Sequence, residues 1–203
     1  EALQGKGTKV QLVVPYRNNP IEQSAAEFYS YPDLEVVYLK TPVWWLENIS
    51  QRLFFPLNRV FFTIQAVWFI KRSNVGSAYS RDLLLSFWAN LLTKKTVVFE
   101  DHEPKKSRRS LYKFILQRIP KKVIVAKGLS KLYEELGVAS DSYIWIPNGV
   151  DIKAFTSREV DRTIWNRKLG IPTNKKIILY TGHFYDWKGV PTLVDSAGHL
   201  PDD

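Results

Sequence analysis

A lysine–glycine pair late in the chain has the residue types of a phosphate site. It closes the segment Tyr180-Thr181-Gly182-His183-Phe184-Tyr185-Asp186-Trp187-Lys188-Gly189-Val190. Gly182 ends a predicted strand, where a glycine lets the backbone approach a ligand closely. A helix predicted to begin at Val190 presents unpaired N–H groups to an anion, and Lys188 adds a full positive charge. The alternative is an ordinary strand-to-helix turn with a solvated lysine. Neither a Gly-x-Gly-x-x-Gly pattern nor a P-loop is present here.

A second candidate site follows the predicted strand at 96–99. The next residues are ionisable and read Glu100-Asp101-His102-Glu103. They lie at the carboxyl end of a strand, which is where open α/β sheets bind their ligands. A histidine there can hydrogen-bond a ligand hydroxyl or move a proton, or it can simply make a local hydrogen bond. No second histidine follows in the His-Glu-x-x-His pattern, so a zinc protease is disfavoured.

Two further polar segments follow predicted strands. Arg81 and Asp82 either reach a ligand, or Asp82 caps a helix that begins at Leu83, which is the interpretation we favour. The other segment reads Pro147-Asn148-Gly149-Val150-Asp151. Asn-Gly is a strong turn signal, so this segment is also explained by a tight turn that leads into a linker.

The elements that position these residues are predicted from apolar periodicity. Short apolar runs, typical of buried parallel strands, cover 10–14, 34–39, 75–80, 96–99, 123–126, 143–146 and 177–181. Predicted helices lie between several of them, at 52–72, 81–92, 107–117, 129–136 and 190–197. This alternation predicts an α/β fold with right-handed crossovers.

The segment 156–176 is mostly polar and predicts a linker between domains. Pro172 breaks any helix before the strand expected at 177–181. We therefore expect one domain over 1–157, and a linker with the start of a second domain over 158–203.

The apolar helix expected at 53–70 raises the question of a membrane. Its longest uncharged stretch is about 11 residues, below the roughly 20 that a spanning helix needs. We predict a helix that packs on the sheet or touches a membrane surface.

Composition narrows the class of protein. The 203 residues contain no cysteine, which excludes disulfides, zinc–thiolate sites and a cysteine nucleophile. Apolar residues make up 45% and charged residues 24%, as in an ordinary globular protein. The net charge of +9 favours anionic partners such as nucleic acid, anionic membranes or phosphorylated ligands. The chain has no methionine and begins at Glu1, so we interpret it as a fragment.

Together these segments resemble the retaining glycosyltransferases of the GT-B fold, family 4. Residues 147–151 followed by Phe155 are similar to that family's Pro-Asn-Gly-Val-Asp-x-x-x-Phe segment. Residues 182–190 are similar to its Gly-Arg-Leu…Lys-Gly loop, and residues 123–138 to the last βα unit of its amino-terminal domain. The resemblance implies a Rossmann-like parallel sheet with flanking helices over 1–157, on the acceptor side and lacking its first strand. It also implies the first βα unit of a second, donor-binding Rossmann-like domain.

The resemblance further implies an activity. The enzyme would be of the hexosyltransferase type and act in polysaccharide biosynthesis. It would transfer sugar from a nucleoside-diphosphate sugar to an acceptor with retention of configuration, without a metal or other cofactor. The 203 residues alone would be inactive, because so small a piece of the donor domain cannot bury a core of its own.

The resemblance implies a role for each matched residue. Lys188 would neutralise the departing diphosphate and Gly182 would let the backbone approach it. His102 would contact the transferred sugar, so His102 and Lys188 are the catalytic candidates. His183 stands where the family has arginine, and a neutral imidazole binds a diphosphate less well than a guanidinium unless it is protonated. Three further residues are acceptor-side candidates: Arg81, Asp82 and Glu103.

Other functions stay open. One is a non-enzymatic binding module for anionic lipid or nucleic acid, and another is a different GT-B enzyme such as an epimerase or phosphorylase. For a transferase we expect a nucleotide-sugar donor, a saccharide or lipid-linked acceptor, and no nucleic acid. The basic charge and the aromatic runs Trp44-Trp45 and Leu53-Phe54-Phe55 predict peripheral contact with a membrane. The expected location is the cytoplasm, at the inner face of the membrane.

Overall fold

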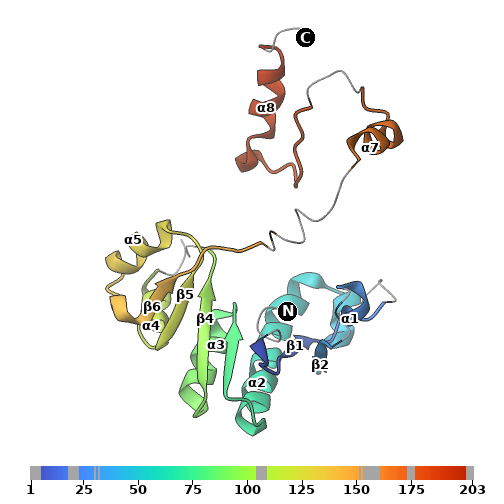
Figure 1. Cartoon of the computed structure of the whole chain (residues 1–203). Coiled ribbons are helices and arrows are strands. Elements are labelled where there is room, and N and C mark those ends of the chain that lie inside the picture. Colours follow the sequence, from blue (N-terminus) through green and yellow to red (C-terminus); the bar gives the residue numbers. More distant parts are fainter. Residues whose placement is uncertain are drawn as a thin grey trace. The chain divides into compact units, whose positions relative to one another are not determined.

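Strands and helices alternate along the first part of the chain, and the strand pairs that the structure describes are all parallel. The computed structural model describes residues 6–17, 23–29, 31, 33–103, 109–150, 152, 161–172 and 177–199. The chain divides into two compact units, Glu1–Gly149 and Val150–Asp203, which are coloured from blue to orange and from orange to red in Figure 1. The predicted domain boundary between 157 and 158 lies outside the described residues.

A four-stranded sheet with the order β3-β4-β5-β6 is the main layer of the first unit. Its strands are β3 (Ser77–Ser80), β4 (Thr96–Asp101), β5 (Lys121–Ile124) and β6 (Tyr143–Trp145). The connecting helices are α3 (Leu83–Leu92), α4 (Arg109–Leu116) and α5 (Gly128–Glu135). The 3₁₀ turn η3 (Ser140–Ser142) leads into β6. Because the strands are parallel, their carboxyl ends meet at one edge, as the sequence predicted for an α/β fold.

A second, two-stranded sheet pairs β1 (Gln11–Pro15) with β2 (Glu35–Leu39). The short helix α1 (Ala25–Phe28) lies between them in the chain. No described strand bonds to both sheets, so two sheets stand where the sequence predicted one.

The long helix α2 joins the two sheets. It covers Gln51–Arg72 and follows the 3₁₀ helix η2 (Trp44–Asn48). Leu39 of β2 and Ala78 of β3 both pack against the cluster that contains the buried face of α2. The helix predicted at 52–72 is therefore confirmed, and one side of it belongs to the core.

The largest core cluster lies between the four-stranded sheet and helices α4 and α5. Its buried members are Phe99, Tyr112, Ile115, Leu116, Ile119, Ile124, Leu129, Tyr133, Leu136 and Val138. Asp101 is also buried there, and its Oδ2 accepts hydrogen bonds from the hydroxyls of Tyr112 and Tyr133. Burial raises the pKa of both tyrosines, and the Asp101 carboxylate raises each pKa further. The two phenols therefore stay protonated and hold α4 and α5 to the end of β4.

Asp82 caps α3. Its Oδ1 accepts a hydrogen bond of 2.9 Å from the backbone N–H of Leu85. This satisfies one of the free donors in the first turn, so the predicted cap is confirmed. After β6, the edge strand farthest from β3, the tight turn considered for the Asn-Gly pair is not formed, because residues 146–150 are irregular and Gly149 has no positive φ.

The second unit contains α7 (Arg162–Leu169), the 3₁₀ turn η4 (Asp186–Lys188) and α8 (Val190–Ala197). The helix predicted at 190–197 is confirmed. The strand predicted at 177–181 is wrong: this segment pairs with no described strand, and a lone extended segment has no ladder to stabilise it. The segment predicted as a linker contains α7, which Asp161 caps and Gly170 ends at φ 66°.

Replacing Tyr133 with phenylalanine removes one of the two hydroxyls that donate to the buried Asp101. We expect Tyr133→Phe to lower the free energy of unfolding by about 1–3 kcal/mol, because a hydrogen bond to a buried charge is lost. Urea denaturation followed by circular dichroism measures the change. Tyr143→Phe is the matched control, since its ring packs edge-on against Tyr133 at 5.0 Å and its hydroxyl bonds no described residue. Equal losses in both variants would show that the hydroxyl contributes nothing.

Candidate functional site

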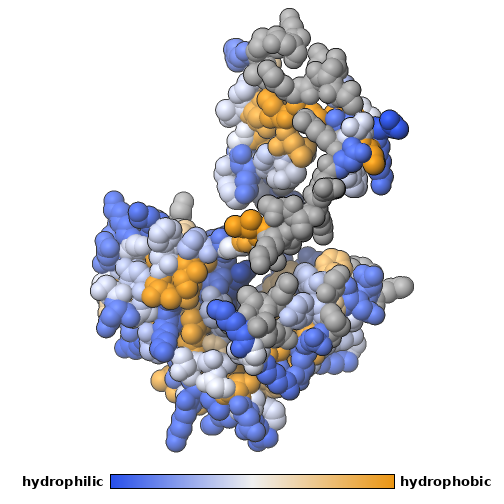
Figure 2. All heavy atoms as spheres, viewed as in Figure 1, coloured by the Kyte–Doolittle hydropathy of each residue, from blue (hydrophilic) through white to orange (hydrophobic). Residues whose placement is uncertain are grey.

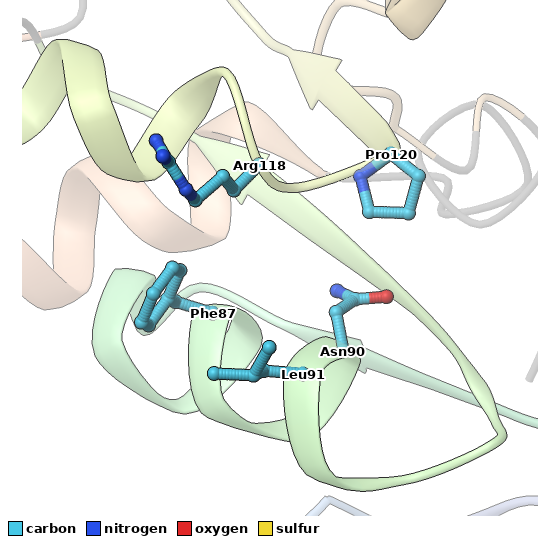
Figure 3. A pocket seen from close by; sticks show the side chains of 5 residues that line it. All are labelled: Phe87, Asn90, Leu91, Arg118 and Pro120. Atoms are coloured by element: carbon cyan, nitrogen blue, oxygen red, sulfur yellow. The ribbon is translucent and has the colours of Figure 1, made fainter.

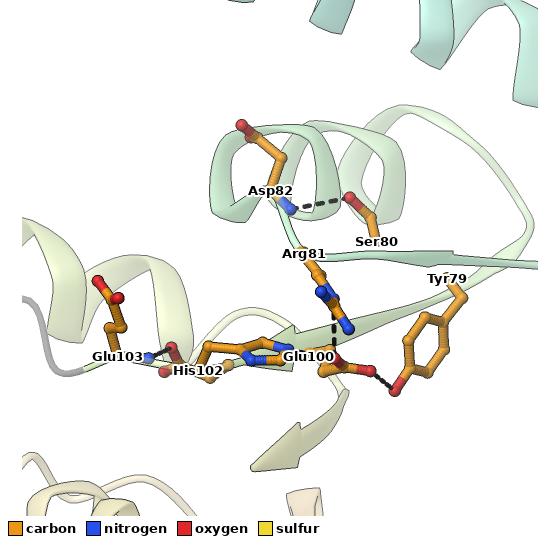
Figure 4. Close-up of polar contacts among 8 residues, drawn as sticks. Tyr79, Ser80, Arg81, Asp82, Glu100, His102 and Glu103 are labelled. Carbon is orange, nitrogen blue, oxygen red and sulfur yellow. Dashed lines mark hydrogen bonds and ion pairs between the residues drawn. The ribbon is translucent and has the colours of Figure 1, made fainter. Parts of the chain in front are cut away.

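Glu100 gathers three side chains at the carboxyl ends of β3 and β4 (Figure 4). Its Oε1 accepts a hydrogen bond of 2.9 Å from Nε of Arg81 and also contacts Nε2 of His102. Its Oε2 accepts a hydrogen bond from the hydroxyl of Tyr79. We call these four residues the Glu100 cluster.

The period of two along a strand puts the cluster on one face of the sheet. In the parallel register, Tyr79 pairs with Val98 and Ser80 pairs with Phe99. Side chains at Glu100 and His102 therefore point to the face opposite Phe99, as does that of Tyr79. Phe99 belongs to the helix-covered core, so the cluster lies on the other face, at the edge where ligands of α/β sheets bind.

The Glu100 carboxylate is charged at neutral pH although its side chain is largely buried. Its side chain is 10% exposed, whereas that of Arg81 is 70% exposed. Burial by itself raises the pKa of Glu100, but hydrogen bonds from Tyr79 and His102 and the charge of Arg81 outweigh it and hold that pKa below its ordinary value. Burial and the Glu100 carboxylate raise the pKa of Tyr79, which therefore remains a donor.

The contact with Glu100 also sets the tautomer of His102. A carboxylate only accepts hydrogen bonds, so the imidazole must present Nε2–H to it. Nδ1 is then the ring atom left to accept a hydrogen bond, or to donate one when the ring is protonated. The side chain is 29% exposed, so solvent or a ligand can reach it. A histidine held in one orientation by a carboxylate suits proton transfer or binding of a hydroxyl.

Of the four candidates predicted in the first unit, His102 and Arg81 are brought together. Asp82 is not, because its Oδ1 caps α3 and its Oδ2 pairs with Nε of Arg59 at 2.7 Å. Glu103 donates its backbone N–H to Oδ1 of Asp101 at 3.4 Å, and in Figure 4 its carboxylate points away from the cluster.

Tyr79 and Glu100 are the members of the cluster that the candidate site residues did not include. Their signal was in the sequence: Tyr79-Ser80-Arg81 and Glu100-Asp101-His102 each place two polar side chains two positions apart at a strand end. The prediction ended the strand at Phe99, whereas β4 continues to Asp101. The two extra residues bring Glu100 onto the face shared with Tyr79.

In the second unit, Gly182 shapes the predicted donor loop. Its φ is 148°, and a Cβ atom there would lie 3.0 Å from the hydroxyl oxygen of Tyr180. That hydroxyl donates a hydrogen bond of 2.9 Å to the carbonyl oxygen of His183. A side chain at position 182 would therefore displace Tyr180 and loosen the loop.

Lys188 ends η4, immediately before Gly189 and α8. Gly189 has φ 70°, and no side chain caps the first turn of α8. The N–H groups of that turn therefore have no intrahelical partner, except that Pro191 has no N–H. The Nζ of Lys188 lies 4.4 Å from the ring centroid of Trp187. The predicted combination of a lysine, a glycine and an uncapped helix start is present, and it is suited to an anion.

A hollow of about 360 Å³ lies at the amino ends of the strands of the four-stranded sheet, away from the Glu100 cluster (Figure 3). It is lined by Phe87, Asn90, Leu91, Arg118 and Pro120. Pro120 directly precedes β5, so this hollow is at the amino ends of the strands and no predicted site residue lines it.

Comparison with known proteins finds glycosyltransferases. No protein-family model matches the chain. Over 80 residues the chain is 30% identical to WcaI of Escherichia coli K12, which carries the provisional name of a colanic acid biosynthesis glycosyl transferase. This match covers 39% of the chain and 20% of WcaI.

Two solved structures share the fold. A glycosyltransferase from Rickettsia africae matches 98% of the chain with a TM-score of 0.68 and 19% identity. Anabaena HepE, solved with UDP and glucose, matches 93% with a TM-score of 0.67 and 14% identity. The chain covers 51% and 50% of these two proteins respectively. The described fold is therefore a Rossmann-like α/β fold with parallel sheets and flanking helices, as in part of a GT-B glycosyltransferase.

The lowered pKa of Glu100 predicts a pH-dependent stability. A carboxyl whose folded-state pKa lies below its unfolded value stabilises the protein above the unfolded pKa, and that contribution is lost as pH falls through the folded pKa. We expect Glu100→Gln to lower the free energy of unfolding by about 1–3 kcal/mol at pH 7, because a charged acceptor is lost.

The difference between wild type and Glu100→Gln should shrink as pH falls below about 4.5, the ordinary value for a glutamate. Urea denaturation at pH values from about 7 down to about 3.5 measures this difference in the free energy of unfolding. Glu103→Gln removes the same charge outside the cluster and serves as the control. A difference independent of pH, or equal in the two variants, would contradict the described role of Glu100.

Proposed function

We propose that the protein containing this chain is a glycosyltransferase that uses a nucleoside-diphosphate sugar. The observation that carries the proposal is the fold shared with HepE over 93% of the chain, because that structure was solved with UDP and glucose. The local similarity to WcaI supports the same class. Since the chain spans about half the length of these solved structures, the activity belongs to the whole polypeptide.

The proposed donor residues lie in the second unit. Lys188 and the uncapped start of α8 bind the diphosphate, and Lys188 neutralises the charge that develops as it departs. Gly182 keeps the loop backbone open to the diphosphate. His183 stands where family 4 has an arginine, and it stabilises the phosphates when its imidazole is protonated beside them.

The proposed sugar and acceptor residues lie in the Glu100 cluster. His102 contacts the transferred sugar through Nδ1, because Glu100 occupies Nε2. Arg81 is largely exposed beside it and presents donors to a hydroxyl or an anionic group of the acceptor. Glu100 acts as a positioning residue, since its carboxylate orients both the imidazole and the guanidinium.

The finer features of the proposal follow the resemblance to family 4. Transfer of a hexosyl group proceeds with retention of configuration and needs no metal, because Lys188 and the helix start supply the positive charge at the leaving group. The acceptor is a saccharide or a lipid-linked saccharide in polysaccharide biosynthesis. The enzyme works in the cytoplasm at the inner face of the membrane.

Replacing Lys188 tests the donor site. We expect Lys188→Met to reduce kcat/KM for the nucleotide sugar at least tenfold, because a full charge beside the leaving diphosphate is lost. A panel of nucleotide sugars screened by thermal shift first identifies the donor of the polypeptide containing residues 1–203. Lys168→Met is the matched control, since Lys168 is also an exposed lysine whose Nζ lies near a tryptophan ring. If no nucleotide sugar binds, while DNA or anionic lipid binds in a salt-sensitive manner, the protein is a binding module instead.

Replacing His102 tests the sugar site. We expect His102→Ala to lower kcat by about a hundredfold, the usual contribution of a positioned acid–base or hydrogen-bonding group. The KM for the nucleotide sugar should change by a smaller factor than kcat, because His102 is proposed to contact the sugar and not the diphosphate. Steady-state kinetics with the identified donor measure both constants, and His199→Ala is the control for loss of an imidazole. Unchanged kcat in His102→Ala would remove His102 from the mechanism.

A further inference from the structure

The outer side of α2 carries an apolar stripe that nothing described covers. Its members are Leu53, Leu57, Val60, Ile64 and Trp68, and they are between 42% and 60% exposed. Spacings of four, three, four and four residues place them within about 80° around the helix axis. We call these five residues the α2 stripe.

The α2 stripe is separate from the side of the helix that stabilises the fold. The buried residues Ala66, Val67 and Ile70 pack against α3 and strands of both sheets. Phe54, Asn58 and Thr63 of α2 are buried as well, whereas no member of the stripe is. Exposed rows of large apolar side chains on soluble proteins usually mark interaction sites.

The charged residues within α2 are all positive. Arg52 stands near one end of α2, and Lys71 and Arg72 stand at the other; all three are exposed. The helix contains no aspartate or glutamate. The guanidinium of Arg72 lies over the ring of Trp68, 3.9 Å from its centroid. An apolar band with tryptophan at its edge and cations at both ends matches the boundary between lipid headgroups and acyl chains.

The neighbouring helix also has exposed apolar side chains and a lysine near its end. α3 packs beside α2 and leaves Trp88, Leu91 and Leu92 exposed, and Lys94 follows it. In Figure 2, hydrophobic surface lies at the lower end of the first unit, where Figure 1 draws the ends of α2 and α3.

By length and composition α2 is apolar enough to cross a membrane, so its short uncharged stretch was not a valid reason against a span. Its packing against α3 and both sheets rules out that it spans the bilayer as a lone helix in this fold, since Ala66, Val67 and Ile70 would have to leave the core. Burying one side in lipid leaves those contacts intact. A second copy is a poorer occupant, because an antiparallel pairing of two α2 helices would bring Arg52 of one against the cations at the other's end.

We propose that the α2 stripe docks the protein on the surface of an anionic membrane. The apolar side chains enter the boundary of the acyl chains, and Arg52, Lys71 and Arg72 bind anionic headgroups at the two ends. The proposal does not depend on the glycosyltransferase activity, because the stripe shares no residue with the Glu100 cluster or the Lys188 loop.

Vesicle flotation tests the proposal with the polypeptide containing residues 1–203. We expect binding to phosphatidylcholine vesicles that contain phosphatidylglycerol, at least tenfold weaker binding to phosphatidylcholine alone, and weakening by salt. The double variant Ile64→Ser/Trp68→Ser should bind at least tenfold less. Lys71→Glu/Arg72→Glu should lose the preference for the anionic vesicles.

The matched control is Ile164→Ser/Trp165→Ser on α7, which also removes an exposed isoleucine and a tryptophan with a nearby cation. It should bind vesicles as the wild type does. Circular dichroism and urea denaturation show whether each variant is folded. Equal binding of folded stripe and control variants, or no preference for anionic lipid, overturns the proposal. So does a dimer in solution that the stripe variant abolishes while the wild type binds no vesicles.

Discussion

Two neighbouring carboxylates at the end of β4 face opposite sides of the sheet, and the core and the candidate site of the first unit each depend on one of them. Asp101 turns into the core and accepts hydrogen bonds from Tyr112 and Tyr133. Glu100 turns to the other face and accepts from Tyr79, Arg81 and His102. Because side chains alternate strictly along a strand, a slip of one residue would exchange the two carboxylates and destroy both networks.

This arrangement couples stability to the candidate site. The buried tyrosines hold α4 and α5 to the strand whose end carries Glu100 and His102. The strand cannot shift without leaving a buried charge unpaired, which is costly in a low-dielectric core. Tyr79 and Glu100 of the cluster therefore lie on strands, and Glu100 holds the imidazole of His102, which directly follows β4, in one orientation for a ligand.

The two sides of helix α2 also have different roles. One side joins β2 and β3 through the core, while the opposite side presents the α2 stripe. The sequence explains why the two sides are easily confused, because α2 is apolar nearly all round. Only packing separates the side that stabilises the fold from the side left open to a partner.

The sequence by itself determined the α/β class, the order of elements in the first unit and the cap at Asp82, because these depend on local periodicity and short-range hydrogen bonds. It also pointed to His102 and Arg81 at strand ends. Tertiary structure decided that Glu100 joins Arg81 to His102, since the parallel register of β3 and β4 brings Arg81 to a residue 19 positions further along the chain. It also decided that 177–181 forms no described strand, because a strand exists only where a second one pairs with it.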